Sequence, residues 1–593
     1  AGASAVTGTL TLTSGAVTMS SDTLTIGTAG AVTRTAGWVA GPLKKYIPTG
    51  TSSRTFEVGD ASVYAPVVVA FTSVTTAGNL AITTTGTDHP DIANSGVSAG
   101  LSANRYWTLA PNGIAFGTYD ATFNFDPADV DVGADPTSFI VDEYTGGAWT
   151  LPATGTVTST STQATGLTAF GDFVTGISAA SLFTSTAAGG AWNAASTWVG
   201  GVVPGLNADV VIATTGGNTV SLTANPSNVR SLVINSGATL EGAGATTLNL
   251  NLATSTNFVN NGTFNANGVT VRLARNSTWD GAGVFNLDAI NLNARRLTLA
   301  FSSPETVSVS AAGNPFLNAG TLVPGSNSTI RFDGSAAQTL AVSTLNFNSV
   351  IVDNPAGVTA NATITSSKLS GDLSVVSGQL DNGGFAVTLA AGKDFTLADG
   401  ATYRTGGTNA LPTVSSGGTV SLGSTSTVEY YGSTQTVTRV DYGSLTLSNA
   451  GTKTFATDTT HIAGDFIVTG ATVDATTNST TIEFNGTGAQ SIPSINFYRL
   501  VVTGAGPVTM AGPISLGGDL AVLNGVFDNN GNNVTIASGR SVLVVNGASY
   551  RAGGTTSLPT VSGGGSILLA TTSTVIYYGG AQAVTLADYG SLT

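Results

Sequence analysis

The chain has 593 residues, a net charge of −14 at pH 7 and only 9% charged residues, against about 25% in an ordinary soluble protein. The 19 Lys and Arg residues form no long run, which excludes a basic nucleic-acid-binding face. With no Cys, only two His and no apolar stretch near the roughly 18–20 residues that span a bilayer, the sequence also excludes thiol chemistry, multi-histidine metal sites and membrane insertion.

Short runs of alternating polar and apolar residues dominate the chain. Examples are GTLTLTSG at Gly8–Gly15, NTVSLT at Asn218–Thr223 and NVTIAS at Asn533–Ser538. Each run places apolar side chains on one face of a strand and Thr, Ser or Asn on the other. Helical spacing is nearly absent, and Gly, Asn, Asp and Pro separate the runs. The sequence therefore predicts an all-β protein.

Residues 1–37 are predicted to be the end of a preceding β-solenoid segment, because Val6–Val17 aligns with Leu369–Leu380 farther along the chain. Residues 38–178 differ from this pattern. They hold three of the six Trp, no internal repeat, and strand-like runs separated by Gly, Asp and Pro turns. Over about 140 residues this predicts an Ig-like antiparallel β-sandwich interposed between solenoid segments.

A Trp-rich motif follows, and residues 179–230 are predicted to be the cap region at the start of a second solenoid. We interpret Trp192 and Trp198 as a hydrophobic cover for its first coil. Residues 231–593 are predicted to form the solenoid itself, a stack of β-helix coils in which each coil contacts mainly its neighbours.

An internal repeat at a spacing of 147 residues, from Asp372 to Asp519, is the basis of the solenoid prediction. Residues 372–446 recur at 519–593 without insertion or deletion, and the second copy stops part-way through a repeat. A solenoid end leaves unpaired strands. We therefore expect either that the native chain is longer or that identical chains join end to end. A strand ending in an aromatic residue, then Gly, then Gln, also recurs, with the glutamines at Gln338, Gln435, Gln490 and Gln582.

The most site-like string is acidic. Asp129, Asp131 and Asp135 are the candidate metal ligands, because they would present oxygen atoms to Ca²⁺ from one turn. The twelfth position counted from Asp129 is Ile140, where an EF-hand has Glu. The favoured interpretation is an acidic, solvated loop between strands, with Ca²⁺ as the alternative and no other cofactor expected.

Two tyrosine pairs, Tyr430–Tyr431 and Tyr577–Tyr578, are candidate glycan-stacking platforms that recur with the repeat. Alternation sends one Tyr of each pair inward, where stacking between coils explains it. Gly-Asp pairs also recur, too regularly for a single active site, and we expect each Asp to bond its own backbone in a turn. They lie at Asp172, Asp372, Asp465 and Asp519.

An enzyme is the alternative class, since parallel β-helices also carry polysaccharide-degrading sites. Such a site needs paired carboxylates, or a base beside Arg or Lys, on one face. The densest charged stretch, Val271–Arg296, alternates in sign as an exposed strand surface does, and nothing marks a pair of carboxylates in separate environments. We therefore predict that the chain is not an enzyme. A flat Thr array for ice or crystal surfaces is disfavoured by the irregular Thr spacing.

Two segments resemble a known class of proteins. GGAWNAASTWVGGVVPGLNADVVI at Gly189–Ile212, followed by SLVINSGATL at Ser231–Leu240, resembles the start of solenoid segments in very large bacterial cell-surface repeat proteins, typically exported by the type IX pathway. Val39–Gly176, with VAGPLKKYI, FEVGD, YAPVVV, NRYWTL and FGDFVTG, resembles the sandwich modules of the same proteins. The resemblance implies an extracellular stalk, adhesin or filament component, and no catalytic residues carry over.

Together these features predict a structural segment of an extracellular surface fibre, stalk or adhesin, built by stacking of β-coils. Its expected partners are further copies, or the continuation, of the same chain, and surface glycans. A carbohydrate-binding or polysaccharide-degrading β-helix protein is the alternative. Sparse charge favours the fibre, because like charges repeated in every coil would repel at strand spacing.

Overall fold

We describe the chain from a computed structural model, in which residues 4–19, 22–132, 134–179, 182–205, 208–223, 229–251 and 258–593 are described. It is 52% strand and 2% helix, and it forms a β-solenoid of stacked coils, about 25 in all. These findings confirm the all-β and solenoid predictions. Within these residues the helices are four single 3₁₀ turns: η1 (Ile92–Asn94), η2 (Pro127–Asp129), η3 (Pro136–Ser138) and η4 (Ala195–Thr197).

The chain divides into two compact units. Unit 1 comprises Ala1–Leu182 with Leu206–Asp209, and unit 2 comprises Phe183–Gly205 with Val210–Thr593. The predicted cap region, 179–230, includes residues 180–181, 206–207 and 224–228, which lie outside the described residues.

Unit 1 contains two large sheets. The eight-stranded sheet has the order β1 (Ser4–Val6), β4 (Leu24–Ile26), β7 (Leu43–Ile47), β11 (Gly78–Thr85), β12 (Val97–Asn112), β19 (Asp172–Ser178), β15 (Ile140–Thr145) and β16 (Ala148–Thr150). The six-stranded sheet has the order β13 (Ala115–Phe116), β10 (Val67–Thr76), β14 (Tyr119–Asn124), β18 (Ser161–Leu167) and β17 (Ala153–Val157), with β8 (Gly50–Phe56) also paired to β10. Smaller ladders join β2 (Thr9–Leu12) to β5 (Ala31–Arg34), and β3 (Ala16–Thr18) to β6 (Trp38–Ala40) and β9 (Val58–Gly59).

The two sheets of unit 1 share one hydrophobic core. Trp107 of β12 and Phe123 of β14 are both fully buried, with ring centres 5.2 Å apart. β4 pairs in parallel with β7, and β7 pairs antiparallel with β11. The predicted boundary between residues 37 and 38 therefore lies inside one continuous sheet. The Ig-like assignment of residues 38–178 stays a prediction.

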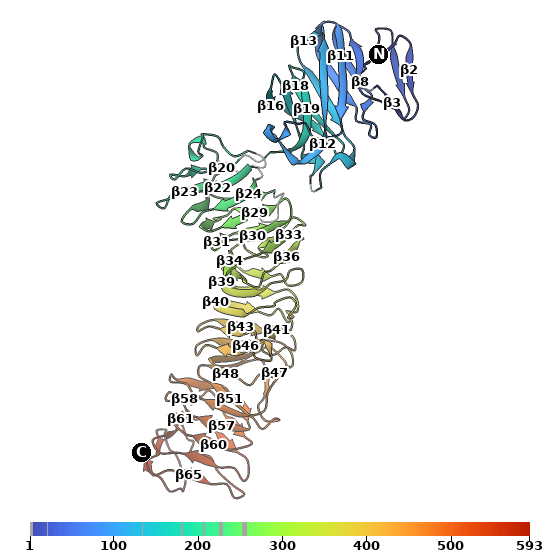
Figure 1. Cartoon of the computed structure of the whole chain (residues 1–593). Coiled ribbons are helices and arrows are strands. Elements are labelled where there is room, and N and C mark those ends of the chain that lie inside the picture. The colour runs from blue at the N-terminus through green and yellow to red at the C-terminus, as the bar shows by residue number, and fades with distance from the viewer. Residues whose placement is uncertain are drawn as a thin grey trace. The chain divides into compact units, whose positions relative to one another are not determined.

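Unit 2 is a stack of coils joined by parallel ladders (Figure 1). The sixteen-stranded sheet consists of β21 (Gly190–Ala191), β23 (Thr219–Leu222), β25 (Thr239–Gly242), β28 (Thr263–Asn265), β31 (Val284–Leu287), β34 (Glu305–Val309), β37 (Ser328–Phe332), β39 (Ser349–Ala360), β40 (Leu373–Asp381), β43 (Thr402–Thr405), β46 (Thr427–Tyr430), β49 (Ser444–Ser448) and β52 (Phe466–Thr469), with β38 (Gln338–Leu340), β42 (Phe395–Leu397) and β45 (Val420–Leu422). The eleven-stranded sheet consists of β35 (Phe316–Leu317), β32 (Ala289–Asn291), β29 (Thr270–Leu273), β26 (Thr247–Leu250), β24 (Val229–Ile234), β27 (Phe258–Asn260), β30 (Ser277–Asp280), β33 (Arg296–Leu299) and β36 (Thr321–Val323), with β20 (Leu182–Thr184) and β22 (Ala208–Ile212).

The later coils of unit 2 carry five further sheets. The longest consists of β48 (Asp441–Tyr442), β51 (Thr459–Ile462), β54 (Thr481–Phe484), β57 (Arg499–Val502), β60 (Leu520–Val522), β63 (Val542–Val544) and β65 (Ile567–Leu569). The next consists of β55 (Gln490–Ile492), β58 (Pro507–Met510), β61 (Val526–Asp528), β64 (Ser549–Ala552), β66 (Thr574–Tyr577) and β67 (Ser591–Leu592). The short ones are β41 (Thr388–Ala391) with β44 (Thr413–Ser415); β47 (Gln435–Val437), β50 (Thr452–Phe455) and β53 (Thr472–Asp474); and β56 (Asn496–Phe497), β59 (Ile514–Leu516) and β62 (Val534–Ile536).

The two tryptophans predicted to cover the first coil are buried against each other in unit 2. Trp192 and Trp198 are each 2% exposed, their ring centres lie 5.0 Å apart, and the indole N–H of Trp198 donates to the Trp192 carbonyl. Farther along, the Tyr-Tyr-Gly sequence ends at a corner of its coil, where the backbone passes close to that of the preceding coil. A Cβ atom on Gly432 would lie 2.0 Å from the carbonyl oxygen of Gly407 in the preceding coil, so only glycine fits there.

Candidate functional site

The spacing of paired residues changes abruptly in the middle of unit 2. Thr402 of β43 pairs with Thr427 of β46, and Thr427 pairs in turn with Ser444 of β49, so the second step along the chain is much shorter than the first. A long coil is therefore followed directly by a short one. The same change recurs in the second copy of the repeat, where β64 pairs with β66 and β66 pairs with β67 at the same two spacings.

These two coils do not stay in register all the way round, because their perimeters differ. β43, β46 and β49 remain joined in one sheet. Among the described strands, however, β45 pairs only with β42, and β44 pairs only with β41. On the short coil, β47 starts a new ladder with β50, and β48 starts one with β51. We call this discontinuity the seam.

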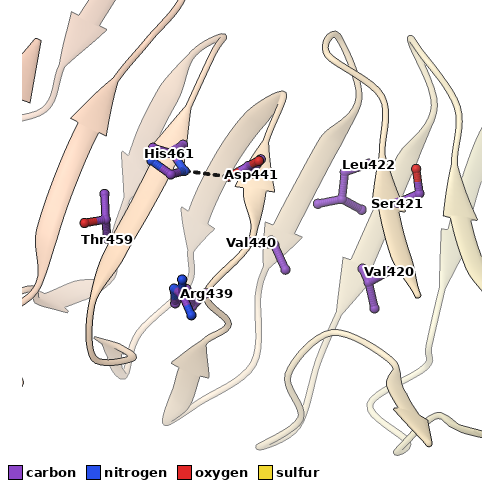
Figure 2. A pocket seen from close by; sticks show the side chains of 8 residues that line it. All are labelled: Val420, Ser421, Leu422, Arg439, Val440, Asp441, Thr459 and His461. Atoms are coloured by element: carbon purple, nitrogen blue, oxygen red, sulfur yellow. Dashed lines mark hydrogen bonds and ion pairs between the residues drawn. The ribbon is translucent and has the colours of Figure 1, made fainter. Parts of the chain in front are cut away.

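A groove of about 480 Å³ lies at the seam between β45 and β48, and we call it the seam groove (Figure 2). Figure 2 shows the three residues of β45 on one side, with Asp441 and His461 on neighbouring strands across from them. The residues that line it are Val420, Ser421, Leu422, Arg439, Val440, Asp441, Thr459 and His461. The seam groove thus has apolar side chains on its long-coil side and charged side chains on its short-coil side.

An acidic column borders the seam groove. Asp441, His461 and Glu483 are register partners on β48, β51 and β54, so their side chains follow one another along the stack. His461 Nδ1 lies 2.5 Å from Asp441 Oδ1, and His461 Nε2 lies 3.5 Å from Glu483 Oε2. Two carboxylates against one imidazole keep the column negative in either protonation state of the histidine. The side chain of Asp441 is 83% exposed, so its charge is open to a ligand.

β45 presents an unpaired backbone edge to the seam groove. The N–H of Gly423 donates to the carbonyl of Leu397, so the odd-numbered residues of this segment bond to β42. Alternate residues of a strand direct their N–H and C=O groups to opposite sides. Those of Val420 and Leu422 therefore face the groove, and no strand in the described part of the chain pairs with them.

This arrangement suits binding better than catalysis. His461 has a carboxylate at each ring nitrogen, so neither nitrogen is directed at the hydroxyl of Ser421 or Thr459. A free backbone edge beside two apolar side chains, Val420 and Leu422, has instead the parts that hold an extended segment.

The outer tyrosine of each predicted pair belongs to a polar cluster that is repeated in both copies. Tyr431 donates its hydroxyl to Asp381 over 2.5 Å, and the guanidinium of Arg404 lies 4.6 Å from its ring centre. Burial, together with the bond to Asp381, raises the pKa of Tyr431. The matching residues of the second copy are Tyr578, Asp528 and Arg551. Glycan stacking stays a prediction, with Arg404 already at the ring face of Tyr431.

The inner tyrosine of the first pair is a core residue. Tyr430 is fully buried, and its hydroxyl lies 2.9 Å from that of Tyr442. Tyr442 donates to the carbonyl of Thr438, whose N–H donates to Tyr430. The three residues therefore close a hydrogen-bonded ring inside the short coil. The matching ring of the second copy consists of Tyr577, Thr585 and Tyr589.

The acidic segment of unit 1 is held by separate hydrogen bonds. Asp129 pairs with the buried guanidinium of Arg105 at 2.9 Å. Asp131 accepts a hydrogen bond from the Ser102 N–H, and Asp135 caps η3. Within the described residues, no group of three His, Cys, Asp or Glu side chains is placed to hold a metal ion. The structure therefore does not bring the three predicted ligands together.

The recurring glutamine ties the corner of one coil to the preceding coil. Gln490 accepts a hydrogen bond from the Gly486 N–H and donates to the carbonyls of Ile462 and Gly464, both at 2.8 Å. The other members make the same set of bonds, to a Gly N–H just before them and to carbonyls one coil earlier; they are Gln338, Gln435 and Gln582.

The expectation that the Gly-Asp carboxylates bond their own turns is wrong for three of them. The carboxylate of Asp172 lies 3.2 Å from His89 Nε2. Asp372 accepts from the backbone N–H of Asp394 at 3.1 Å, and Asp519 accepts from that of Ser541 at 2.9 Å. Both donors belong to the next coil. In these two cases the Gly-Asp sequence, which predicted a turn, marks a hydrogen bond between coils.

Sequence reasoning missed the seam groove. Asp441 stood out only as part of the repeat, and His461 only as one of two histidines. The signal that would have found them is the interval between equivalent coil corners, from Ser426 to Gly443, which is shorter than the intervals on either side. That interval is visible only once the corners have been assigned.

Compared with known proteins, the sequence matches no family model, no curated protein and no solved structure at a significant level. Among the described residues, no helix has the length and apolar character needed to cross a membrane.

Proposed function

We propose that the chain is a structural segment of an extracellular surface fibre, stalk or adhesin. The observation that supports this most directly is the succession of parallel, in-register pairings that passes from coil to coil through unit 2. In such a stack each coil is stabilised by its neighbours, so length is gained without a larger core. A stack of this kind serves as a spacer.

Side chains add to the backbone ladders along the stack. The recurring glutamines and the carboxylates of Asp372 and Asp519 each bond from one coil to an adjacent one. These bonds run in the same direction as the strand-to-strand bonds. A pull along the stack would therefore load many hydrogen bonds at once.

The extracellular part of the proposal is supported by the resemblance of Gly189–Ile212 and Val39–Gly176 to bacterial cell-surface repeat proteins. Proteolytic shaving of intact producing cells tests it. We expect protease to release peptides of this chain into the medium while a cytoplasmic marker stays intact. Release of these peptides only after lysis would contradict a surface location.

Single-molecule pulling of the full chain from its two ends tests the structural role. We expect extension in small steps, each lengthening the chain by about 6–9 nm, because coils of roughly 17 to 25 residues unravel at roughly 3.3–3.6 Å per residue. Collapse of unit 2 at low force in one step would argue against a load-bearing stack.

A further inference from the structure

We propose that the seam groove binds an extended polypeptide segment, which adds as a strand between β45 and β48 and carries a Lys or Arg flanked by apolar residues. This inference does not depend on the proposed fibre function. It rests on an unpaired strand edge, the size of the groove and the charge beside it.

The first argument is the free edge. Val420 and Leu422 direct their backbone N–H and C=O groups into the seam groove, where no described strand pairs with them. An added strand would bond to these groups, as in other cases of strand addition to a sheet edge. The ladders of unit 2 around the seam are parallel, so the added segment would also run parallel to β45.

The second argument is size. In a packed sheet each residue occupies about 160 Å³, given a strand spacing of about 4.8 Å, a rise of about 3.3 Å per residue and a layer spacing of about 10 Å. The groove of about 480 Å³ therefore has room for about three residues. β45 is itself three residues long, Val420–Leu422.

The third argument is the pattern of side chains that the site would accept. Val420 and Leu422 are partly buried and Ser421 is exposed, so the first and third residues of an added strand would point inward and should be apolar. The second would point outward, between Ser421 and Asp441. Asp441 is the exposed carboxylate beside this position, and the guanidinium of Arg439, which also lines the groove, lies 3.8 Å from the carboxylate of Asp458. A Lys or Arg therefore fits this position.

Fluorescently labelled peptides test the proposal on the full chain. The probe is an acetylated, amidated Thr-Val-Lys-Val-Thr peptide, and the comparison peptide is Thr-Val-Glu-Val-Thr. We expect the Lys peptide to bind more tightly, measured by fluorescence anisotropy, and to slow hydrogen exchange at the amides of Val420 and Leu422. No binding of the Lys peptide up to 1 mM, or binding that leaves these two amides unprotected, would overturn the proposal.

The charge argument is tested by Asp441→Lys, with Asp465→Lys as the matched control at an exposed Asp of unit 2 that does not line the seam groove. Both side chains are exposed, so both variants should fold. We expect Asp441→Lys to weaken binding of the Lys peptide roughly 5–10-fold and to make the Glu peptide the tighter binder. The difference in interaction energy between opposite and like charges on adjacent strands corresponds to about this factor. Asp465→Lys should leave both affinities unchanged. Equal effects of the two variants, or none, would refute selection by the acidic column.

Discussion

At the scale of single residues, unit 2 depends on side chains that complete the backbone hydrogen bonds of an adjacent coil. Gln490 is 3% exposed and serves three backbone groups, at Gly486, Ile462 and Gly464. A corner of a coil interrupts the ladder, so backbone groups there lack strand partners. Glutamine suits this role because its amide is both donor and acceptor.

Gln490→Leu keeps the size of the side chain but leaves these three backbone groups without their partner. We expect a loss of about 2–3 kcal/mol in the stability of the surrounding coils, because buried unpaired polar groups are costly. Hydrogen exchange at Ile462 and neighbouring amides measures it. Gln379→Leu, at a partly exposed position of β40, is the control and should change stability by less than about 0.5 kcal/mol.

Glu143 in β15 shows the opposite condition, a buried polar group without a complete set of partners. It is 5% exposed, and its Oε1 atom has no hydrogen-bond partner among the described residues. Burial, with repulsion from Asp142, raises the pKa of Glu143 to about 7 from its ordinary 4.5. Between these two values the folded state retains a proton that the unfolded state releases.

This group therefore stabilises unit 1 fully below about pH 4.5, and the contribution is lost as the pH rises through 7. We expect the stability of unit 1 to fall between pH 5 and 8. Glu143→Gln should flatten that dependence, because the amide stays neutral. Exchange of the β15 and β19 amides at several pH values, corrected for intrinsic rates, provides the measurement. An unchanged slope in the variant would assign the proton to another group.

At the scale of elements, the lengths of successive coils decide where ladders continue and where they stop. The long coil from Thr402 to Thr427, followed by the short one that ends at Ser444, keeps β43 and β46 paired but separates β45 from β48. The continuing sheet carries a charged ladder across three strands. Arg404 of β43 bonds to Asp381 of β40 and to Glu429 of β46, at 2.8 and 2.6 Å.

The repeat supplies a comparison for this ladder, because the second copy has Arg551 and Asp528 but Ile576 in place of Glu429. Arg404→Met would leave two carboxylates without their ion-pair partner, whereas Arg551→Met would leave one. We expect losses of about 1–2 kcal/mol for Arg404→Met and less than about 1 kcal/mol for Arg551→Met. Urea unfolding followed by local hydrogen exchange measures both. A larger effect of Arg551→Met would disprove the two-carboxylate account.

At the scale of the whole molecule, the 9% charge is a property of the stack. In unit 2, register pairing places equivalent outward positions of successive coils side by side. The exposed column Asn496, Ser515 and Thr535 on β56, β59 and β62 is one such series. Neutral polar side chains stand at strand spacing there without repulsion.

Replacing all three residues of this column by Lys should destabilise the coils by about 1–2 kcal/mol more than the three single changes together, because each adjacent pair adds repulsion. The extra loss should shrink in 1 M NaCl, where the Debye length is about 3 Å. Thermal unfolding at both salt concentrations tests this. The control is a Lys-Glu-Lys column of equal bulk, which should lack the extra loss.

The alternation of apolar and polar residues, the corner glycines and the 147-residue repeat determined the all-β solenoid, because strand period and repetition are local properties that can be read along the chain. They also predicted that one tyrosine of each pair turns inward. The partners of Asp372 and of the glutamines were not predictable, since both bond to residues of another coil, 22 to 30 positions away.

The seam groove was even less predictable from the sequence. Its four charged or hydroxyl-bearing contributors on the short-coil side follow ordinary strand patterns, and nothing in those patterns says that β45 and β48 fail to pair. Whether β45 and β48 pair depends on the different perimeters of two consecutive coils that share one core. Which residues form strands was thus decided locally by the sequence, and which strand edges stay open was decided only by the stacking of coils.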